Sequence, residues 1–197
     1  MPFVFKRLAL LMSIAAAFAA DKETAFHAPA AASMEHRQTN APVTVGVDPY
    51  VSGEKVKLAF GKLVPYQYGV LPVLVVVQND GKQSIRLDKL KAEYVSPNGD
   101  RVTATPASDI RYARGARQPT ITPGPAGEIK RRLKKNPLAD SSIEVHALSA
   151  PVVLAGNSAS GFLYFETGLQ KGATLYLSGI TEAGTGKELL YFEIPIQ

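Results

Sequence analysis

Basic side chains gather in one stretch of the chain, residues 111–135, where only Glu128 is acidic and the local charge is +7. Such a segment can attract polyanions, including anionic glycans, lipid head groups or nucleic acid. Its only aromatic residue is Tyr112, which does not favour the base stacking of a single-strand binder. The alternative is a solvated loop that keeps the domain soluble. The candidate anion-binding residues are Arg111, Arg114, Arg117, Lys130, Arg131, Arg132, Lys134 and Lys135.

A catalytic triad needs a Ser or Cys nucleophile, a His and a carboxylate brought together. Cysteine is absent, and His146 is the one histidine outside the N-terminal leader. We expect His146 to lie on a strand over 143–148, facing solvent on the same side as Glu144. No Gly-x-Ser-x-Gly motif is present. We therefore predict no catalytic residues, and a hydrolase with an unrecognised site stays as an alternative.

Metal binding has little support. Met34, His36 and His27 could offer ligands to copper, but a flexible leader gives them no preorganised geometry. Two pairs of acidic residues stand out: Glu182 and Glu188 flank a hairpin turn, and Asp80 and Asp88 flank another segment. Turn and surface roles account for these carboxylates. We predict no metal site and no cofactor.

Tyrosines form a second candidate surface. Tyr164, Tyr176 and Tyr191 lie on predicted strands. If they line the outward face of a sheet, they would form a patch for a protein partner. The alternative is core packing between two sheets.

The element that organises the chain is the apolar run 70–77, which leads into Gln78-Asn-Asp-Gly81. A short apolar run bounded by turn residues is typical of a strand buried on both faces. Further strands are predicted over 43–47, 85–87, 90–95, 101–105, 143–148, 159–166, 174–180 and 188–196. A short helix is predicted over 52–60, with Ser52 as its cap and Gly61 at its end. The alternative is a strand over 56–60, because Val56, Leu58 and Phe60 also alternate. Residues 113–140 hold four prolines and three glycines, which predicts a long mobile insertion.

The N-terminus has the pattern of an export signal over 1–19. Lys6 and Arg7 precede an apolar stretch of 11 residues, and Ala17-Phe-Ala19 gives a cleavage pattern near Ala19 or Ala20. Cleavage would leave 20 basic and 17 acidic residues, a charge of +3. We expect a periplasmic or secreted protein, with a membrane anchor only if the signal is not cleaved. A flexible leader is predicted over 20–42, followed by one domain over 43–197.

Seven or eight short strands with little helix predict a mainly β fold, an antiparallel β-sandwich of immunoglobulin-like topology. The chain has 197 residues with 46% hydrophobic content, enough for one domain with a core, and no disulfide can form. The combination favours an exported, non-enzymatic binding module. Its expected partner is an envelope protein, or an anionic glycan or lipid through the basic segment, and nucleic acid is not favoured.

Several strand and turn sequences support this assignment by resemblance. They are Tyr68-Gly-Val-Leu-Pro-Val73 with Gln78-Asn-Asp80, then Gly161-Phe-Leu-Tyr-Phe165, Leu175-Tyr-Leu-Ser-Gly179 and Leu190-Tyr-Phe-Glu-Ile-Pro195. In these pieces the chain resembles a group of secreted bacterial proteins with no assigned activity. The resemblance implies an exported β-sandwich and brings no catalytic residues.

Overall fold

The structure is a computed structural model, and it describes residues 26–113, 120–123, 129–132, 136–189 and 191–196. The predicted signal over 1–19 therefore lies outside the described residues. The helices are η1 (Ala31–Ser33), α1 (Glu54–Phe60), η2 (Pro65–Tyr68), η3 (Ile110–Tyr112) and α2 (Ser141–Val145). The strands are β1 (His36–Asn40), β2 (Val43–Pro49), β3 (Leu71–Asn79), β4 (Ile85–Arg86), β5 (Lys91–Val95), β6 (Arg101–Thr103), β7 (Thr120–Pro123), β8 (Ile129–Arg132), β9 (Val152–Val153), β10 (Ser158–Phe165), β11 (Ala173–Ser178), β12 (Thr181–Glu182) and β13 (Phe192–Ile196).

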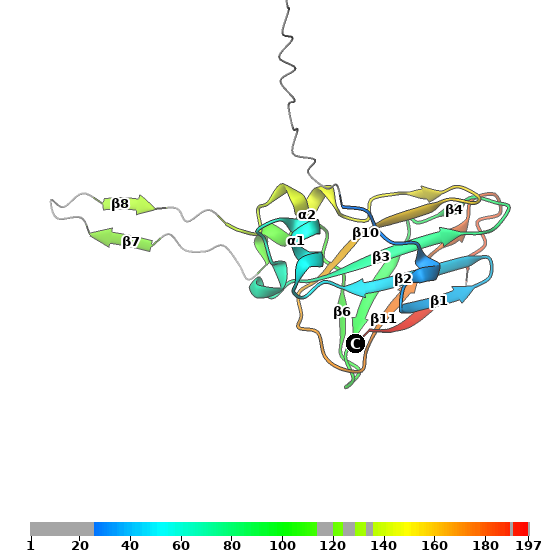
Figure 1. Cartoon of the computed structure of the whole chain (residues 1–197), viewed down its shortest axis with the longest axis horizontal. Coiled ribbons are helices and arrows are strands. Elements are labelled where there is room, and N and C mark those ends of the chain that lie inside the picture. Colours follow the sequence, from blue (N-terminus) through cyan, green and yellow to red (C-terminus); the bar gives the residue numbers. More distant parts are fainter. Residues whose placement is uncertain (1–25, 114–119, 124–128, 133–135, 190, 197) are drawn as a thin grey trace, which may run out of the picture.

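The first sheet has the order β1-β2-β3-β10, with every neighbouring pair antiparallel (Figure 1). Its longest strand, β3, is the predicted apolar run, and all of its residues from Leu71 to Val77 are buried. The second sheet has the order β13-β11-β5-β6, and a small third sheet has the order β12-β4-β9. The predicted mainly β fold and the antiparallel sandwich are confirmed.

One core lies between the sheets. Val73, Val75 and Val77 of β3 pack there with Leu175 and Leu177 of β11. These residues alternate along their strands with residues that point the other way, as the pleat of a strand requires. Burial of this apolar surface is the main driving force for the association of the two sheets.

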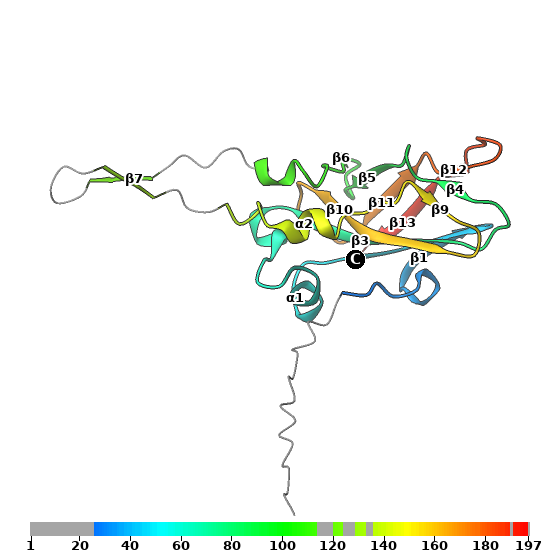
Figure 2. The same ribbon diagram turned by 90° about the horizontal axis from the view of Figure 1, so that it is seen from above.

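A second core explains why β3 is apolar on both sides. Leu74 and Val76 face away from the sandwich and pack with Phe60 of α1, Ile143 of α2 and Phe162 of β10. Figure 2 shows α1 and the N-terminal segment on this face, opposite β11 and β13. The protein therefore has three layers, two of sheet and one of short helices, and β3 lies in the middle layer.

Polar contacts join the two main sheets along one edge. The Gln38 side chain of β1 accepts a hydrogen bond from the Glu193 backbone N–H at 2.7 Å. Asn40 donates its side-chain amide to the Tyr191 carbonyl, also at 2.7 Å. On the opposite side the Thr105 N–H donates to the Tyr164 carbonyl of β10 at 2.7 Å, where the chain passes from one sheet to the other.

The predicted strand over 143–148 is wrong. Asp140 accepts a hydrogen bond from the Ser142 N–H at 2.9 Å and caps α2, which places Ile143 in the second core. Ser and Asp favour helix starts because their oxygens satisfy free N–H groups. Of the predicted strand, only Ala147 forms a bridge, parallel to Phe162.

The N-terminal boundary also needs correction. His36–Asn40 falls in the predicted flexible leader, yet it forms β1 and pairs with β2 along its whole length. Ala31 and Met34 are buried in the second core. The helix prediction holds for α1, except that Gly53 and not Ser52 is its N-cap and no side chain caps it.

Within the predicted insertion over 113–140, β7 and β8 form a two-stranded antiparallel hairpin that pairs with no other described strand. These eight residues of the predicted insertion are therefore in strands.

Candidate functional site

Two tyrosines, one exposed and one half-buried, lie on the outside of the second sheet. The strand register places Tyr176 of β11 between Glu93 of β5 and Glu193 of β13. Tyr191 is two residues before Glu193 and so shares its side of the strand. Arg101 of β6 is two residues from Thr103, which pairs with Glu93. We call Tyr176, Tyr191, Arg101, Glu93 and Glu193 the tyrosine face.

The two tyrosine rings stack on each other. Their centroids are 5.3 Å apart and the ring planes differ by 27°. The guanidinium of Arg101 lies over the Tyr176 ring, 5.4 Å from its centroid. Arg101 also donates to the Glu93 carboxylate at 2.6 Å. Aromatic stacking and cation–π contact each stabilise such an arrangement at an exposed site by roughly 0.5–1 kcal/mol. The side chains of Tyr191, Tyr176 and Arg101 are therefore preorganised.

The face is open to solvent. Tyr191 is 51% exposed and is one of the large hydrophobic residues exposed on the described part of the protein. Arg101 and Glu193 are exposed, whereas Tyr176 and Glu93 are half-buried. Two rings, one cation and two carboxylates within one patch can contact a partner through apolar surface, ion pairs and hydrogen bonds together.

Tyr164 does not belong to this face. It lies in the second core, 1% exposed, and its hydroxyl donates to the Ile143 carbonyl at 2.7 Å. Burial raises the pKa of the Tyr164 hydroxyl well above its usual range. Of the three predicted tyrosines, the structure therefore brings Tyr176 and Tyr191 together on the outward face and places Tyr164 in the interior.

The basic segment is described only in part. Arg111 is exposed and forms an ion pair with Glu144 of α2, while its Nε donates to the Ser108 carbonyl at 3.1 Å. Lys130, Arg131 and Arg132 are in β8, where the backbone pairs with β7. Arg114, Arg117, Lys134 and Lys135 lie outside the described residues. Arg111 already has an acidic partner, so it is a weaker candidate for anion binding than its charge suggests.

His146 follows α2 and is half-buried, so the predicted solvent-facing strand position is wrong. Its ring lies 5.6 Å from the Phe26 ring and 6.3 Å from the Phe60 ring, measured between centroids. Glu144 forms an ion pair with Arg111. The contacts of the His146 ring within the described residues are therefore with aromatic rings.

The acidic pairs have structural partners. Asp88 forms an ion pair with Arg86, whose hydrogen bond lowers the pKa of the Asp88 carboxyl. Asp80 accepts from the Gln78 side chain at 2.8 Å. Glu182 accepts from the Thr185 hydroxyl at 2.7 Å, and Glu188 from the Gly179 N–H at 3.1 Å. As predicted, these carboxylates serve turns and surface contacts.

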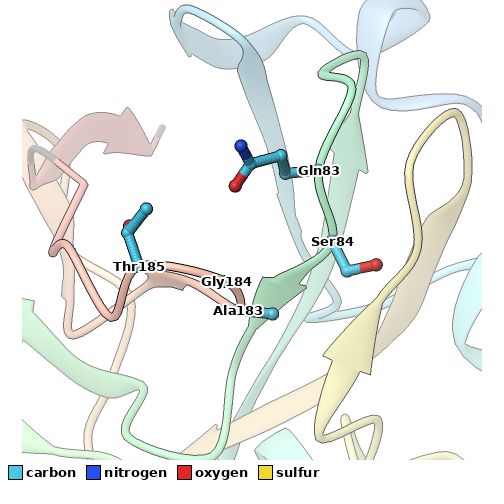
Figure 3. A pocket seen from close by; sticks show the side chains of 5 residues that line it. All are labelled: Gln83, Ser84, Ala183, Gly184 and Thr185. Atoms are coloured by element: carbon cyan, nitrogen blue, oxygen red, sulfur yellow. The ribbon is translucent and has the colours of Figure 1, made fainter.

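A shallow hollow of about 590 Å³ lies between the loop that follows β3 and the turn that follows β12 (Figure 3). Gln83, Ser84 and Thr185 line it with Ala183 and Gly184, and the Ala183 N–H donates to the Ser84 carbonyl at 2.8 Å. None of its lining side chains is acidic, basic or a histidine. The hollow therefore offers hydrogen bonds but no acid–base catalyst.

No three His, Cys, Asp or Glu side chains in the described ranges come together as a metal site would require. In the same ranges no helix is both long and apolar enough to cross a bilayer.

No family model matches the chain, and no curated protein matches it. Among solved structures, it is similar to the yjhA protein of Bacillus subtilis, with 12% identity over 83% of this chain and 98% of that one and a TM-score of 0.46. The secreted protein MPT63 of Mycobacterium tuberculosis has 14% identity, coverage of 80% and 89%, and a TM-score of 0.33. A functionally unknown protein of Listeria monocytogenes has 12% identity, coverage of 82% for both chains, and a TM-score of 0.37. No residue role is carried over from them, and the immunoglobulin-like topology stays a prediction.

Proposed function

We propose that the protein is an exported, non-enzymatic β-sandwich that binds a partner protein through the tyrosine face. The observation that supports this most is the exposed stack of Tyr191 on Tyr176, with the Arg101 guanidinium over the second ring. Tyr and Arg are among the residues that most often dominate the binding energy of protein interfaces. Export is supported by the signal pattern over 1–19.

The charges around the rings favour a protein over a polyanion at this face. Glu93 and Glu193 border the tyrosines, and Arg101 is partly neutralised by Glu93. An anionic glycan or lipid would meet two carboxylates there, whereas a protein with mixed polar groups can satisfy both signs of charge. The proposed partner surface is therefore apolar at its centre with basic groups at its rim.

The test compares proteins retained from an envelope extract of the native cells by the wild type and by Tyr176→Ala/Tyr191→Ala. Loss of two central tyrosines should reduce retention of a specific partner at least about tenfold, because hot-spot residues each contribute more than about 1 kcal/mol. Leu58→Ala is the matched control, because Leu58 is an exposed apolar residue, 56% accessible, on α1 in the opposite layer. The proposal fails if all three proteins retain the same set in equal amounts.

A second candidate function is polyanion binding by the segment 111–135. It is supported by the +7 charge and by the β7–β8 hairpin, which gives Lys130, Arg131 and Arg132 a strand backbone. Elution of the mature protein from a polyanion column should then require more salt than its net charge of +3 suggests. Changing Arg131, Arg132, Lys134 and Lys135 to Ser should bring elution forward. The charge-matched control changes the exposed Lys57, Lys62, Lys82 and Lys171 to Ser, and equal shifts in the two variants would refute a specific role for the segment.

A further inference from the structure

One edge of the first sheet is only partly covered. Strand β10 pairs with β3 along its whole length, from Ser158 to Phe165, so its other side is the edge of the sheet. The C-terminal half of that edge has partners. The Leu148 N–H donates to the Phe162 carbonyl at 3.1 Å, the Phe162 N–H donates to the His146 carbonyl at 2.8 Å, and Tyr164 accepts from Thr105.

The N-terminal half of the edge is open. In an antiparallel strand the backbone groups of alternate residues point to opposite neighbours. Because Phe162 and Tyr164 point away from β3, the N–H and C=O groups of Ser160 and Ser158 must point away as well. No other described residue donates to them or accepts from them across this edge, and both serines are exposed.

Strand β9 forms the facing wall. It pairs with β4 on one side, and the Leu87 N–H donates to the Pro151 carbonyl at 2.8 Å. By the same alternation the backbone groups of Val152 point away from β4. The side chains of Val152 and Leu154 are 42% and 58% exposed, which is unusual for aliphatic residues.

A groove of about 570 Å³ lies between these two strand edges, which are side by side in Figure 2. It is lined by nine residues, among them Ser149, Val152, Leu154, Ser158 and Ser160, and none of the nine is charged. In a chain with 20% charged residues, this uncharged lining indicates an uncharged ligand. Unpaired backbone groups on the walls indicate that the ligand has backbone groups of its own.

We propose that this groove binds a short, extended and uncharged peptide segment of a partner protein, which adds as a strand to the open edge of β10. Hydrogen bonds to Ser158 and Ser160 would hold its main chain, and its apolar side chains would contact Val152 and Leu154. The open edge spans only Ser158 to Ser160, which suits a short segment better than edge-to-edge pairing of two copies. This groove is separate from the tyrosine face, so the two proposals fail independently.

The probe is a capped hexapeptide, acetyl-Thr-Val-Ser-Val-Thr-Val-amide, added to the mature protein and followed by backbone amide NMR. We expect chemical-shift changes centred on Ser158 and Ser160 and slower hydrogen exchange at these two amides. A hexapeptide with Glu in place of each Val should bind at least about tenfold more weakly, since burying unpaired carboxylates is unfavourable. Shift changes that avoid Ser158 and Ser160, or equal binding of both peptides, would overturn the proposal.

Substitutions in the groove test whether the hexapeptide binds at the open edge of β10. Ser160→Pro removes one outward N–H without removing a bond to β3, and it should weaken binding about fivefold, as loss of one hydrogen bond does. Thr103→Pro, on the outer edge strand β6, is the matched control and should bind as the wild type does. Leu154→Glu places a charge in the groove at an exposed position and keeps the test valid if Ser160→Pro does not fold. Unchanged affinity in Leu154→Glu, or self-association of the wild type through β10 that excludes the peptide, would refute the assignment.

Discussion

At the scale of single residues, Asn79 contributes more than its place in a turn sequence suggests. Its side-chain nitrogen is 2.8 Å from the Gln83 carbonyl and 3.2 Å from the carbonyls of both Val153 and Leu154. Its oxygen accepts from the Gly81 N–H at 3.0 Å. The side chain is fully buried, so it joins the end of β3 to β9 and to the following loop.

Asn79→Ala should lower the free energy of unfolding by about 2–3 kcal/mol, because it leaves buried carbonyls without a donor. Urea unfolding followed by circular dichroism measures the change. Asn157→Ala is the control, since Asn157 is exposed and its side chain makes no hydrogen bond with a described residue, and it should stay within about 0.5 kcal/mol of the wild type. Equal losses in both variants would show that the buried amide has no special role.

Three buried tyrosines make stability depend on alkaline pH. Burial, with a smaller effect of Asp48, raises the pKa of Tyr50 to about 12. Burial also raises the pKa of Tyr94 and of Tyr164. An unfolded tyrosine loses its proton near pKa 10. Above that pH the unfolded state binds fewer protons than the folded state, so stability must fall as pH rises.

We therefore expect the urea midpoint to hold up to about pH 9 and to fall progressively from about pH 10 to about pH 12. The variant Tyr164→Phe should be less stable near neutral pH, because the bond to Ile143 is lost, but its stability should fall less steeply in alkali. A slope identical to that of the wild type would contradict the role of Tyr164.

At the scale of elements, Gly161 of β10 lies where the segment that follows α2, Ala147 and Leu148, passes against this strand. A side chain at this position would overlap the backbone of Leu148 and Ala147, which cannot move aside as a flexible side chain can. The close approach also brings Leu148 to its hydrogen bond with Phe162. The packing of α2 on the first sheet therefore requires glycine here.

Gly161→Ala should lower the free energy of unfolding by about 3 kcal/mol, the upper part of the usual range for overpacking. Thermal unfolding is a suitable measurement. Gly168→Ala is the matched control, because an added methyl group there would meet only the Tyr66 hydroxyl at 3.7 Å, an ordinary contact. If Gly161→Ala unfolds at the same temperature as Gly168→Ala, the close approach of the Leu148 backbone does not constrain the fold.

Local sequence predicts those elements whose hydrophobic pattern is strong. The apolar run of β3 and the alternation in β13, where Phe192, Ile194 and Ile196 are buried, are visible without a structure. Strand β1 is not, because Gln38 and Asn40 join it to β13 by hydrogen bonds and not by apolar burial. The helix α2 is missed because Val145 and Ile143 alternate as a strand would, and the cap at Asp140 decides the outcome.

The tyrosine face is predictable in part, because the alternation of side chains along a strand is visible in the sequence. Alternation places Tyr191 opposite Phe192 and so suggests an outward ring. The contact of Arg101 with Tyr176 depends on the pairing of β6, β5 and β11, residues far apart in sequence, and no local pattern contains it. The open edge at Ser158 and Ser160 likewise becomes visible only when the partners of Phe162 are known.

At the scale of the whole molecule, the three layers separate the candidate surfaces. Short helices cover the part of the outer face of the first sheet that carries the second core. The outer face of the second sheet keeps Tyr191 exposed beside the half-buried Tyr176, and the groove beside β10 lies at an edge of the sandwich. On the two proposals above, the protein would engage two partners, or two parts of one partner, without rearranging its core.

The most direct test of the tyrosine face is photo-crosslinking in the native cells, with Tyr191 replaced by photo-reactive benzoylphenylalanine. We expect a discrete cross-linked species at position 191 that weakens when Arg101→Ala is added, and no such species when the same group replaces Leu58 on α1. Cross-links of equal yield and pattern at both positions would contradict the claim that the tyrosine face is the binding surface.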